Sequence, residues 1–101
     1  MTEVKVLLTW NIRPERDREY FEFLIKRFLP EMQRLGLQPT DAWFTAYGEP
    51  PQVLTAALAP SYEAARSVLH SERWRRLEQR LLEFVTDYRY KIVPAREGFQ
   101  L

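Results

Sequence analysis

The sequence predicts an α+β domain with the element order βαββαβ, in which two helices cover one face of a four-stranded antiparallel sheet. Segments rich in β-branched and aromatic residues alternate with two longer segments of helical periodicity. Proline and glycine residues punctuate the boundaries between these segments. At 101 residues the chain has the length of one domain, so we treat residues 1–101 as a single unit.

In the first half of the chain, a strand is expected over residues 4–12, which end just before Pro14. A helix is expected over residues 15–35, because apolar side chains recur there at intervals of three or four. Gly36 is placed to stop this helix, and Pro30 should kink it or break off its last turn. The apolar stripe consists of Phe21, Leu24, Phe28, Met32 and Leu35.

In the second half, residues 41–47 and 52–59 form a predicted hairpin across a connection dense in glycine and proline. Ser61 is placed to cap the second helix, and Ser71 starts a second helical piece after a polar interruption. Residues 87–93 complete the sheet as its last strand. The buried stripe of the second helix is Ala65, Val68, Leu69, Trp74, Leu77, Leu81 and Val85.

Both helices of a right-handed βαββαβ unit lie on one face of the sheet, so the other face is uncovered. Alternation along the strands sorts their residues into two sets. To the helix side we assign Val6, Leu8, Trp10, Ala42, Phe44, Ala46, Leu54, Ala56, Leu58, Tyr88, Tyr90 and Ile92. To the open side we assign Leu7, Thr9, Asn11, Trp43, Thr45, Tyr47, Val53, Thr55, Ala57, Arg89, Lys91 and Val93.

The open side combines aromatic and aliphatic side chains with polar groups, a mixture typical of a protein interface. Identical chains most often pair about a twofold axis. We therefore predict that the partner is a second copy of this chain, in a homodimer through the sheet face. The alternative is that Trp43 and Tyr47 lie flat on the surface of a monomer.

Composition excludes several other partners. With 15 basic and 14 acidic residues, the chain has no global field to recruit nucleic acid or a membrane surface. Its longest apolar stretches are far shorter than the roughly 20 residues of a membrane span. The absence of cysteine excludes disulfides and thiolate chemistry and is compatible with the cytoplasm, where we place the protein.

Few residues point to chemistry. His70 is the only side chain with an ordinary pKa near neutrality, so it is the candidate for acid–base catalysis, with a surface or capping role as the alternative. Histidine and carboxylate spacing predicts no metal site, and we expect no cofactor. Thr9, Asn11, Trp43 and Tyr47 are the candidate ligand-binding residues of a sheet-lined pocket, unless they are ordinary interface groups.

Scattered residues from Leu7 to Phe99 resemble those of a known family. The run Thr9-Trp10-Asn11-Ile12-Arg13-Pro14 is similar to a family motif T-Y-T-L-K-P, and Ser71-Glu72-Arg73-Trp74 to its D-P-E-W. Further matches to its pattern are Trp43, Thr45, Gly48, Val53, Ser61, Ile92, Val93 and Pro94. The family is the dimeric α/β-barrel proteins, in their NIPSNAP-like branch. The resemblance implies a ferredoxin-like fold and a dimer with facing sheets.

The chain departs from this family in one strand. Members often carry histidine, tryptophan and tyrosine along the third strand, where this sequence has Thr55, Ala57 and Ala59. Among related heme-degrading enzymes, the asparagine, tryptophan and histidine fall on Leu8, Val68 and Glu78, which argues against heme. The resemblance implies no reaction, and we expect an uncharacterised homodimeric domain of this type that holds a small apolar ligand or serves as an assembly module, without demonstrated catalysis.

Two other functions remain open from the sequence. A cofactor-independent monooxygenase of the antibiotic-biosynthesis type, acting on an aromatic substrate, is the enzyme alternative, because it needs a dry pocket and a base more than a fixed motif. Single-stranded RNA binding shares the βαββαβ order but needs aromatic residues on the third strand. Residues 53–59 contain none, so we expect no nucleic-acid partner.

Overall fold

The sheet has four antiparallel strands, as predicted, and their order is β2-β3-β1-β4. The structure is a computed structural model that describes residues 2–45 and 52–95, and of residues 41–45 only the backbone. The strands are β1 (Val4–Ile12), β2 (Gln38–Thr45), β3 (Gln52–Ala59) and β4 (Val85–Pro94). Strand β2 begins earlier than predicted because Pro39 lies in an edge strand, where a missing N–H is tolerated.

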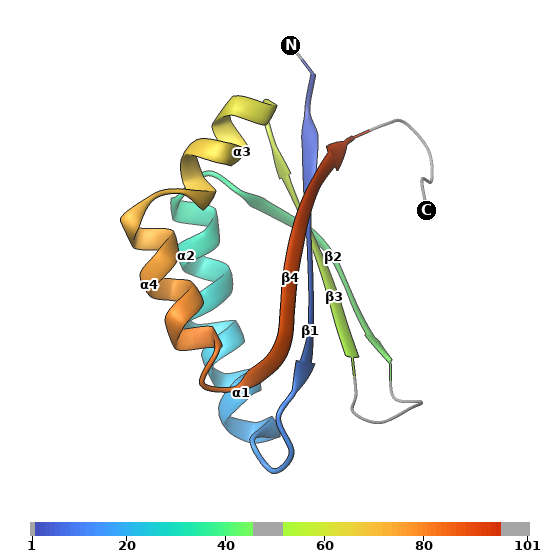
Figure 1. Cartoon of the computed structure of the whole chain (residues 1–101), viewed down its shortest axis with the longest axis vertical. Coiled ribbons are helices and arrows are strands. Elements are labelled where there is room, and N and C mark those ends of the chain that lie inside the picture. The colour runs from blue at the N-terminus through green and yellow to red at the C-terminus, as the bar shows by residue number, and fades with distance from the viewer. Residues whose placement is uncertain (1, 46–51, 96–101) are drawn as a thin grey trace.

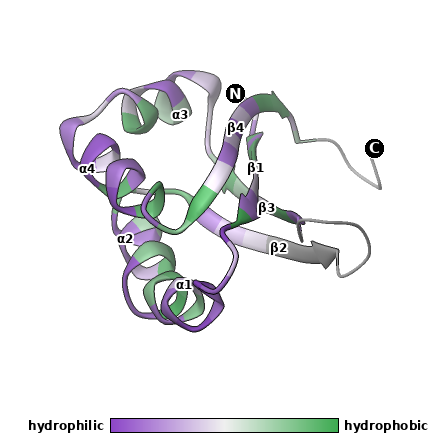
Figure 2. Ribbon diagram, turned by 60° about the horizontal axis from the view of Figure 1, so that its bottom comes forward, coloured by the Kyte–Doolittle hydropathy of each residue, from purple (hydrophilic) through white to green (hydrophobic). Residues whose placement is uncertain are grey.

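All helices pack on one side of this sheet (Figure 1), and the opposite side carries no helix of the described chain (Figure 2). The first helical segment is α1 (Asp17–Phe23), η1 (Leu24–Phe28) and α2 (Leu29–Arg34); the second is α3 (Tyr62–Leu69) and α4 (Glu72–Leu81). Ser61 and Ser71 cap α3 and α4, with side-chain oxygens that accept hydrogen bonds from the backbone N–H groups of Ala64 and Trp74. The two predicted caps are confirmed.

Pro30 leaves the first helix continuous, because the preceding turn is a π-helix rather than a kink. A π turn closes over five residues and therefore brings Phe23 and Phe28 to the same buried face, with ring centroids 6.1 Å apart. The predicted stripe is thus wrong at its start: Tyr20 and Phe23 are buried, whereas Phe21 is 41% exposed. Regular helical spacing cannot anticipate such a turn.

Large rings fill the core between the helices and the sheet. Trp10, Phe28 and Trp74 are fully buried, and the centroid of Phe28 lies 5.8 Å from that of Trp10 and 5.7 Å from that of Trp74. On β1 every second residue is buried, as alternation predicted. The helix layer is therefore held to the sheet mainly by buried aromatic surface.

The predicted faces of β3 are wrong. Antiparallel partners share a face, and Leu8 is paired with Thr55, as Val6 is with Ala57. The helix side of β3 is therefore Val53, Thr55, Ala57 and Ala59, and the open side is Leu54, Ala56 and Leu58. Apart from Thr55, both sets are apolar, so alternation cannot separate them. The core already holds several large rings, beside which small side chains fit.

No helix among the described residues is long and apolar enough to cross a membrane.

Candidate functional site

The uncovered face of the sheet, which we call the open face, has an apolar centre and a polar margin. Leu7, Leu54 and Leu58 lie on the two central strands and are half-buried. Arg89 and Lys91 are paired with Thr9 and Leu7 and lie on the edge strand β4. With the correction to β3, this face is more aliphatic than the sequence led us to expect.

Asn11 lies at one end of the open face, where β4 is irregular. The pairing of β1 with β4 shifts between Thr9 and Asn11, and Asp87 has a φ of 55°, in the left-handed region. The Asn11 amide donates a hydrogen bond of 2.8 Å to the Asp87 carboxylate. Bulges of this kind re-aim side chains at the ends of sheets. Nothing in the sequence links these two residues, which are 76 positions apart.

The four predicted ligand-binding residues are only partly visible. Thr9 and Asn11 lie on the open face, two residues apart on β1. The backbone of Trp43 is paired with Leu54, a residue of the open face, but its side chain lies outside the described residues. Tyr47 lies wholly outside them, as do Ala46 and Gly48. The structure therefore brings Thr9 and Asn11 together and describes no pocket between them and the other two.

His70, the candidate for catalysis, is an exposed residue at the end of α3. Its backbone N–H donates to the carbonyl of Arg66, which closes the last turn of the helix. It lines none of the three described grooves. No group of three or more histidine, cysteine or acidic residues suited to a metal ion occurs within the described part of the chain.

A buried polar pair joins β1 to the first helix. The indole N–H of Trp10 donates a hydrogen bond of 2.9 Å to the hydroxyl of Tyr20, and both side chains are fully buried. Burial raises the pKa of Tyr20 to about 12, although the hydrogen bond from Trp10 acts in the opposite direction. The hydroxyl is thus held neutral and satisfies the indole, as buried polar groups require.

A second polar cluster, which the sequence did not single out, lies between α4 and β4. The Tyr88 hydroxyl donates a 2.5 Å hydrogen bond to the Glu78 carboxylate. Burial, and then this hydrogen bond, raise the pKa of Tyr88. The fully buried Trp74 indole lies one helical turn before Glu78. Its N–H lowers the pKa of Tyr88 slightly but makes no hydrogen bond of normal geometry with any described residue.

This second cluster, Trp74, Glu78 and Tyr88, has a partial signal in the sequence. The spacing of Trp74 and Glu78 by four residues places both on one helix face, and the alternation of β4 turns Tyr88 toward the helices. The pairing across the two elements is not visible in either pattern. A buried indole N–H without a good acceptor is rare and is of interest as a contact point for a ligand or a water molecule.

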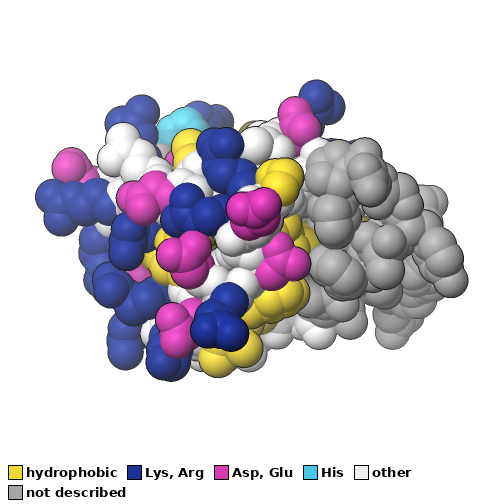
Figure 3. Space-filling model, turned by 90° about the horizontal axis from the view of Figure 1, so that it is seen from below, with side chains coloured by type: hydrophobic (Ala, Val, Ile, Leu, Met, Phe, Trp, Pro, Cys, Tyr) yellow, Lys and Arg dark blue, Asp and Glu magenta, His cyan; other side chains and the backbone are white. Residues whose placement is uncertain are grey.

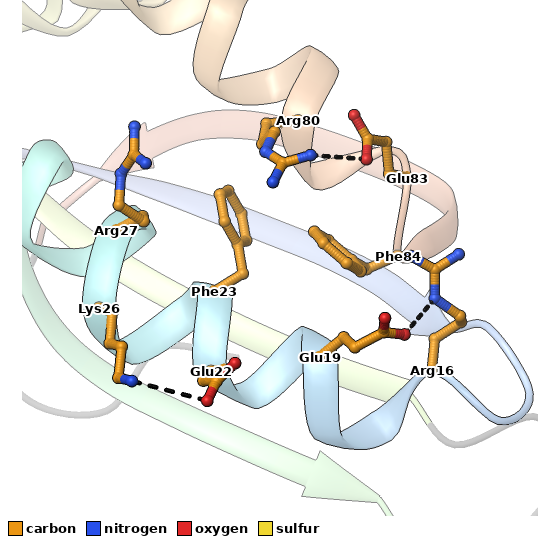
Figure 4. Close-up of a pocket in the computed structure, with 9 residues that line it drawn as sticks. All are labelled: Arg16, Glu19, Glu22, Phe23, Lys26, Arg27, Arg80, Glu83 and Phe84. Atoms are coloured by element: carbon orange, nitrogen blue, oxygen red, sulfur yellow. Dashed lines mark hydrogen bonds and ion pairs between the residues drawn. The ribbon is translucent and has the colours of Figure 1, made fainter.

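Three grooves are described, and all are open to solvent. One of about 520 Å³ lies between α1 and the end of α4 (Figure 4) and adjoins a second of about 280 Å³. A third, of about 480 Å³, is lined mostly by apolar atoms near Val4, Tyr62 and Pro94. None of them contains a residue from the predicted ligand-binding set.

No protein-family model matches the sequence, and no curated protein matches it significantly. Solved structures do match. A NIPSNAP family protein from Agrobacterium tumefaciens is 17% identical, with a TM-score of 0.70 over 95% of this chain and 88% of that one. A NIPSNAP-like domain protein from Burkholderia xenovorans is 12% identical, with a TM-score of 0.72 over 99% and 90%. A variant of SnoaB, a cofactor-independent oxygenase from Streptomyces nogalater, is 15% identical, with a TM-score of 0.69 over 97% of each chain.

These comparisons confirm the expected ferredoxin-like fold of the NIPSNAP and SnoaB type. The likenesses extend over nearly the whole chain, so the fold is shared in full rather than in one motif. At identities of 17% or less they show the fold alone. The oxygenase activity named for SnoaB is a property of that protein.

Proposed function

We propose that this protein is a homodimeric assembly module, in which the open face of one copy is covered by the open face of another. The observation that carries this proposal is a partly exposed aliphatic centre, the half-buried Leu7, Leu54 and Leu58, on a sheet with all its described helices on the other side. Burial of such apolar surface in a dimer contributes a favourable free energy of roughly 25 cal/mol per Å².

The dimensions of the sheet agree with this proposal. Four strands about 4.8 Å apart, with about eight residues rising 3.3 Å each, give a face of roughly 500 Å² in projection. Two such faces bury about 1,000 Å² before side-chain relief is added, which is near the lower limit for a specific interface.

Charge at the sheet margins favours one orientation of the two copies. Arg89 and Lys91 lie on the edge strand β4, and β2 is the opposite edge strand. A twofold axis parallel to the strands lays the β4 edge of one copy over the β2 edge of the other. That arrangement separates the basic side chains of the two copies.

A small apolar ligand between the two sheets is the finer part of this proposal, with Thr9 and Asn11 as its polar contacts and Trp43 and Tyr47 as aromatic ones. Native mass spectrometry of the purified protein tests both parts together. We expect the mass of two chains, with an additional small mass if a ligand is retained. A mass of one chain at micromolar concentration contradicts the proposal.

Because the chain has no cysteine, we further propose a cytoplasmic setting.

A second candidate is a cofactor-independent oxygenase that acts on an electron-rich aromatic substrate. The likeness to SnoaB and the cluster of Trp74, Glu78 and Tyr88 support it, because a partly buried carboxylate beside an unsatisfied indole N–H offers a base and a donor. Oxygen uptake with quinol substrates tests this candidate. Uptake that is lost in Glu78→Gln supports it, whereas no uptake by the unmodified protein removes it.

A further inference from the structure

The two adjoining grooves form one channel between the first helical segment and α4, on the helix layer. They share Phe23, Arg27 and Arg80. The floor of this channel is apolar: Phe23, Leu77 and Phe84 are only 6–7% exposed, and the rings of Phe23 and Phe84 lie 5.3 Å apart. Charged side chains stand along both walls (Figure 4). We call this feature the helix groove.

The charges of the helix groove are not balanced along its length. Six basic and four acidic side chains line it in total. In the smaller part, four arginines line the groove with a single carboxylate, that of Glu31. Basic side chains gather at the outer edge of the helix layer, as the space-filling view shows (Figure 3). Basic side chains are therefore in excess in the smaller part of the groove.

Most carboxylates of the helix groove are paired within their own helix or its end. Glu19 pairs with Arg16 at 2.6 Å, Glu83 with Arg80 at 2.7 Å, and Glu22 with Lys26 at 3.5 Å. Across the groove, the described residues contain one ion pair, in which Arg73 donates to Glu31 from Nε at 3.0 Å and from Nη2. This contact links α4 to α2.

Arg27 lies one helical turn before Glu31 in the first helical segment. A carboxylate at this position would add a second ion pair to the one between Glu31 and Arg73, but the residue is an arginine. Arg27 makes no ion pair or hydrogen bond with any described residue, and it lines both parts of the groove together with Arg80. Figure 4 shows the two guanidinium groups on either side of the Phe23 ring. Both guanidinium groups thus lie beside the apolar floor. An anion placed between them would be attracted by both positive charges.

We propose that the helix groove binds a small organic anion, with its oxyanion between Arg27 and Arg80 and its apolar body against Phe23 and Leu77. Guanidinium groups hold phosphate and carboxylate through paired N–H donors. The donors here come from both walls, so a tetrahedral phosphate presents oxygens to each of them, whereas a planar carboxylate presents only two oxygens in one plane. An aryl phosphate is therefore the preferred chemistry.

Calorimetric titration at low ionic strength tests this site with three probes that share a phenyl ring: phenyl phosphate, benzoate and phenol. We expect phenyl phosphate to bind more tightly than benzoate, and phenol not to bind. Arg27→Gln should weaken phenyl phosphate about tenfold or more, as expected for loss of a charged hydrogen-bonding partner. Arg75→Gln removes the same charge from α4 outside the groove and should leave binding nearly unchanged.

Arg27→Glu is the second variant, because it places a carboxylate where the anion would lie. Binding should disappear because the new carboxylate repels the anion, and a melting temperature close to that of the native protein shows that the variant is folded. Equal losses in Arg27→Gln and Arg75→Gln would mean that only net charge matters and would overturn the proposal. Binding of phenol as tight as that of phenyl phosphate, or no binding at roughly 10 mM phenyl phosphate, would also overturn it. These experiments do not test the dimer proposal, because Arg27 lies on the helix layer and the proposed dimer forms through the open face.

Discussion

At the scale of single residues, buried polar groups decide which side chains are replaceable. Tyr20 is the clearest case, because its hydroxyl accepts the indole N–H of Trp10 in a site without solvent. The aromatic ring alone would fill the same space. The hydroxyl matters because an indole N–H left unsatisfied in the core costs more free energy than the hydrogen bond contributes.

Tyr20→Phe should lower the free energy of unfolding by about 2 kcal/mol at neutral pH, because it leaves the Trp10 indole without an acceptor. In the native protein the pKa of Tyr20 is raised from 10.0 to about 12, so its contribution is complete below pH 10 and is lost as the pH rises toward 12. That loss amounts to about 3 kcal/mol at most.

Urea unfolding at pH 9 and pH 12 measures this effect. The difference between the native protein and Tyr20→Phe should shrink between the two pH values, which separates Tyr20 from Tyr88, whose pKa is also raised. A difference that stays constant over this range would contradict the assignment.

Glu31 carries the acid dependence of the helix layer. The hydrogen bond from Arg73, with a smaller contribution from Arg34, lowers the pKa of the Glu31 carboxyl below its ordinary value of 4.5. Its contribution to stability is therefore complete above pH 4.5 and is lost as the pH falls through the lower, folded-state pKa.

Glu31→Gln should accordingly destabilise the protein at pH 7 and make no difference at a pH below the folded-state pKa. Chemical unfolding across this range tests the prediction, with Glu22→Gln as the matched control. Glu22 pairs with Lys26 at 3.5 Å between exposed side chains, so its loss should have little effect. An equal effect of both substitutions would show that the pair between Glu31 and Arg73 is not special.

At the scale of elements, the sequence predicted boundaries and order better than faces. The alternation of β1 and the serine caps of α3 and α4 each rest on local chemistry, and the structure confirms them. Strand β3 has apolar residues on both sides, and its orientation depends on pairing with β1, which no local pattern contains. The same limit hid the contacts of Asn11 with Asp87 and of Glu78 with Tyr88.

Two neighbouring alanines on β3 test the corrected faces. Ala57 lies on the helix side and is fully buried, so Ala57→Leu should overpack the core and lower the free energy of unfolding by about 1–3 kcal/mol. Ala56 lies on the open side and is 1% exposed but outside the core cluster, so Ala56→Leu should cost less than Ala57→Leu in a folded monomer, because its side chain extends away from the helix layer. The opposite ranking in urea unfolding would restore the faces predicted from the sequence.

At the scale of the whole molecule, the layer arrangement links the fold to assembly. Aromatic side chains fill the space between helices and sheet, and the described grooves lie on the helix layer or near one end of the sheet. The open face has an aliphatic centre of half-buried leucines and no described helix over it. The sequence predicted that this face would be uncovered, but with the leucines of β3 on the wrong side of the sheet.

Leu54→Asp tests whether the open face is an interface, because it places a charge at the aliphatic centre of both copies. The dissociation constant of the dimer should rise by about hundredfold or more. Ile25→Asp is the matched control, since Ile25 is an apolar side chain that is 65% exposed on the helix layer. That substitution should leave the association unchanged.

Sedimentation equilibrium of the native protein and of these two variants is the most direct measurement. We expect the native protein and Ile25→Asp to sediment as dimers at micromolar concentration, and Leu54→Asp to sediment as a folded monomer. A native protein that sediments as a monomer would contradict the account, as would a dimer that Leu54→Asp does not weaken.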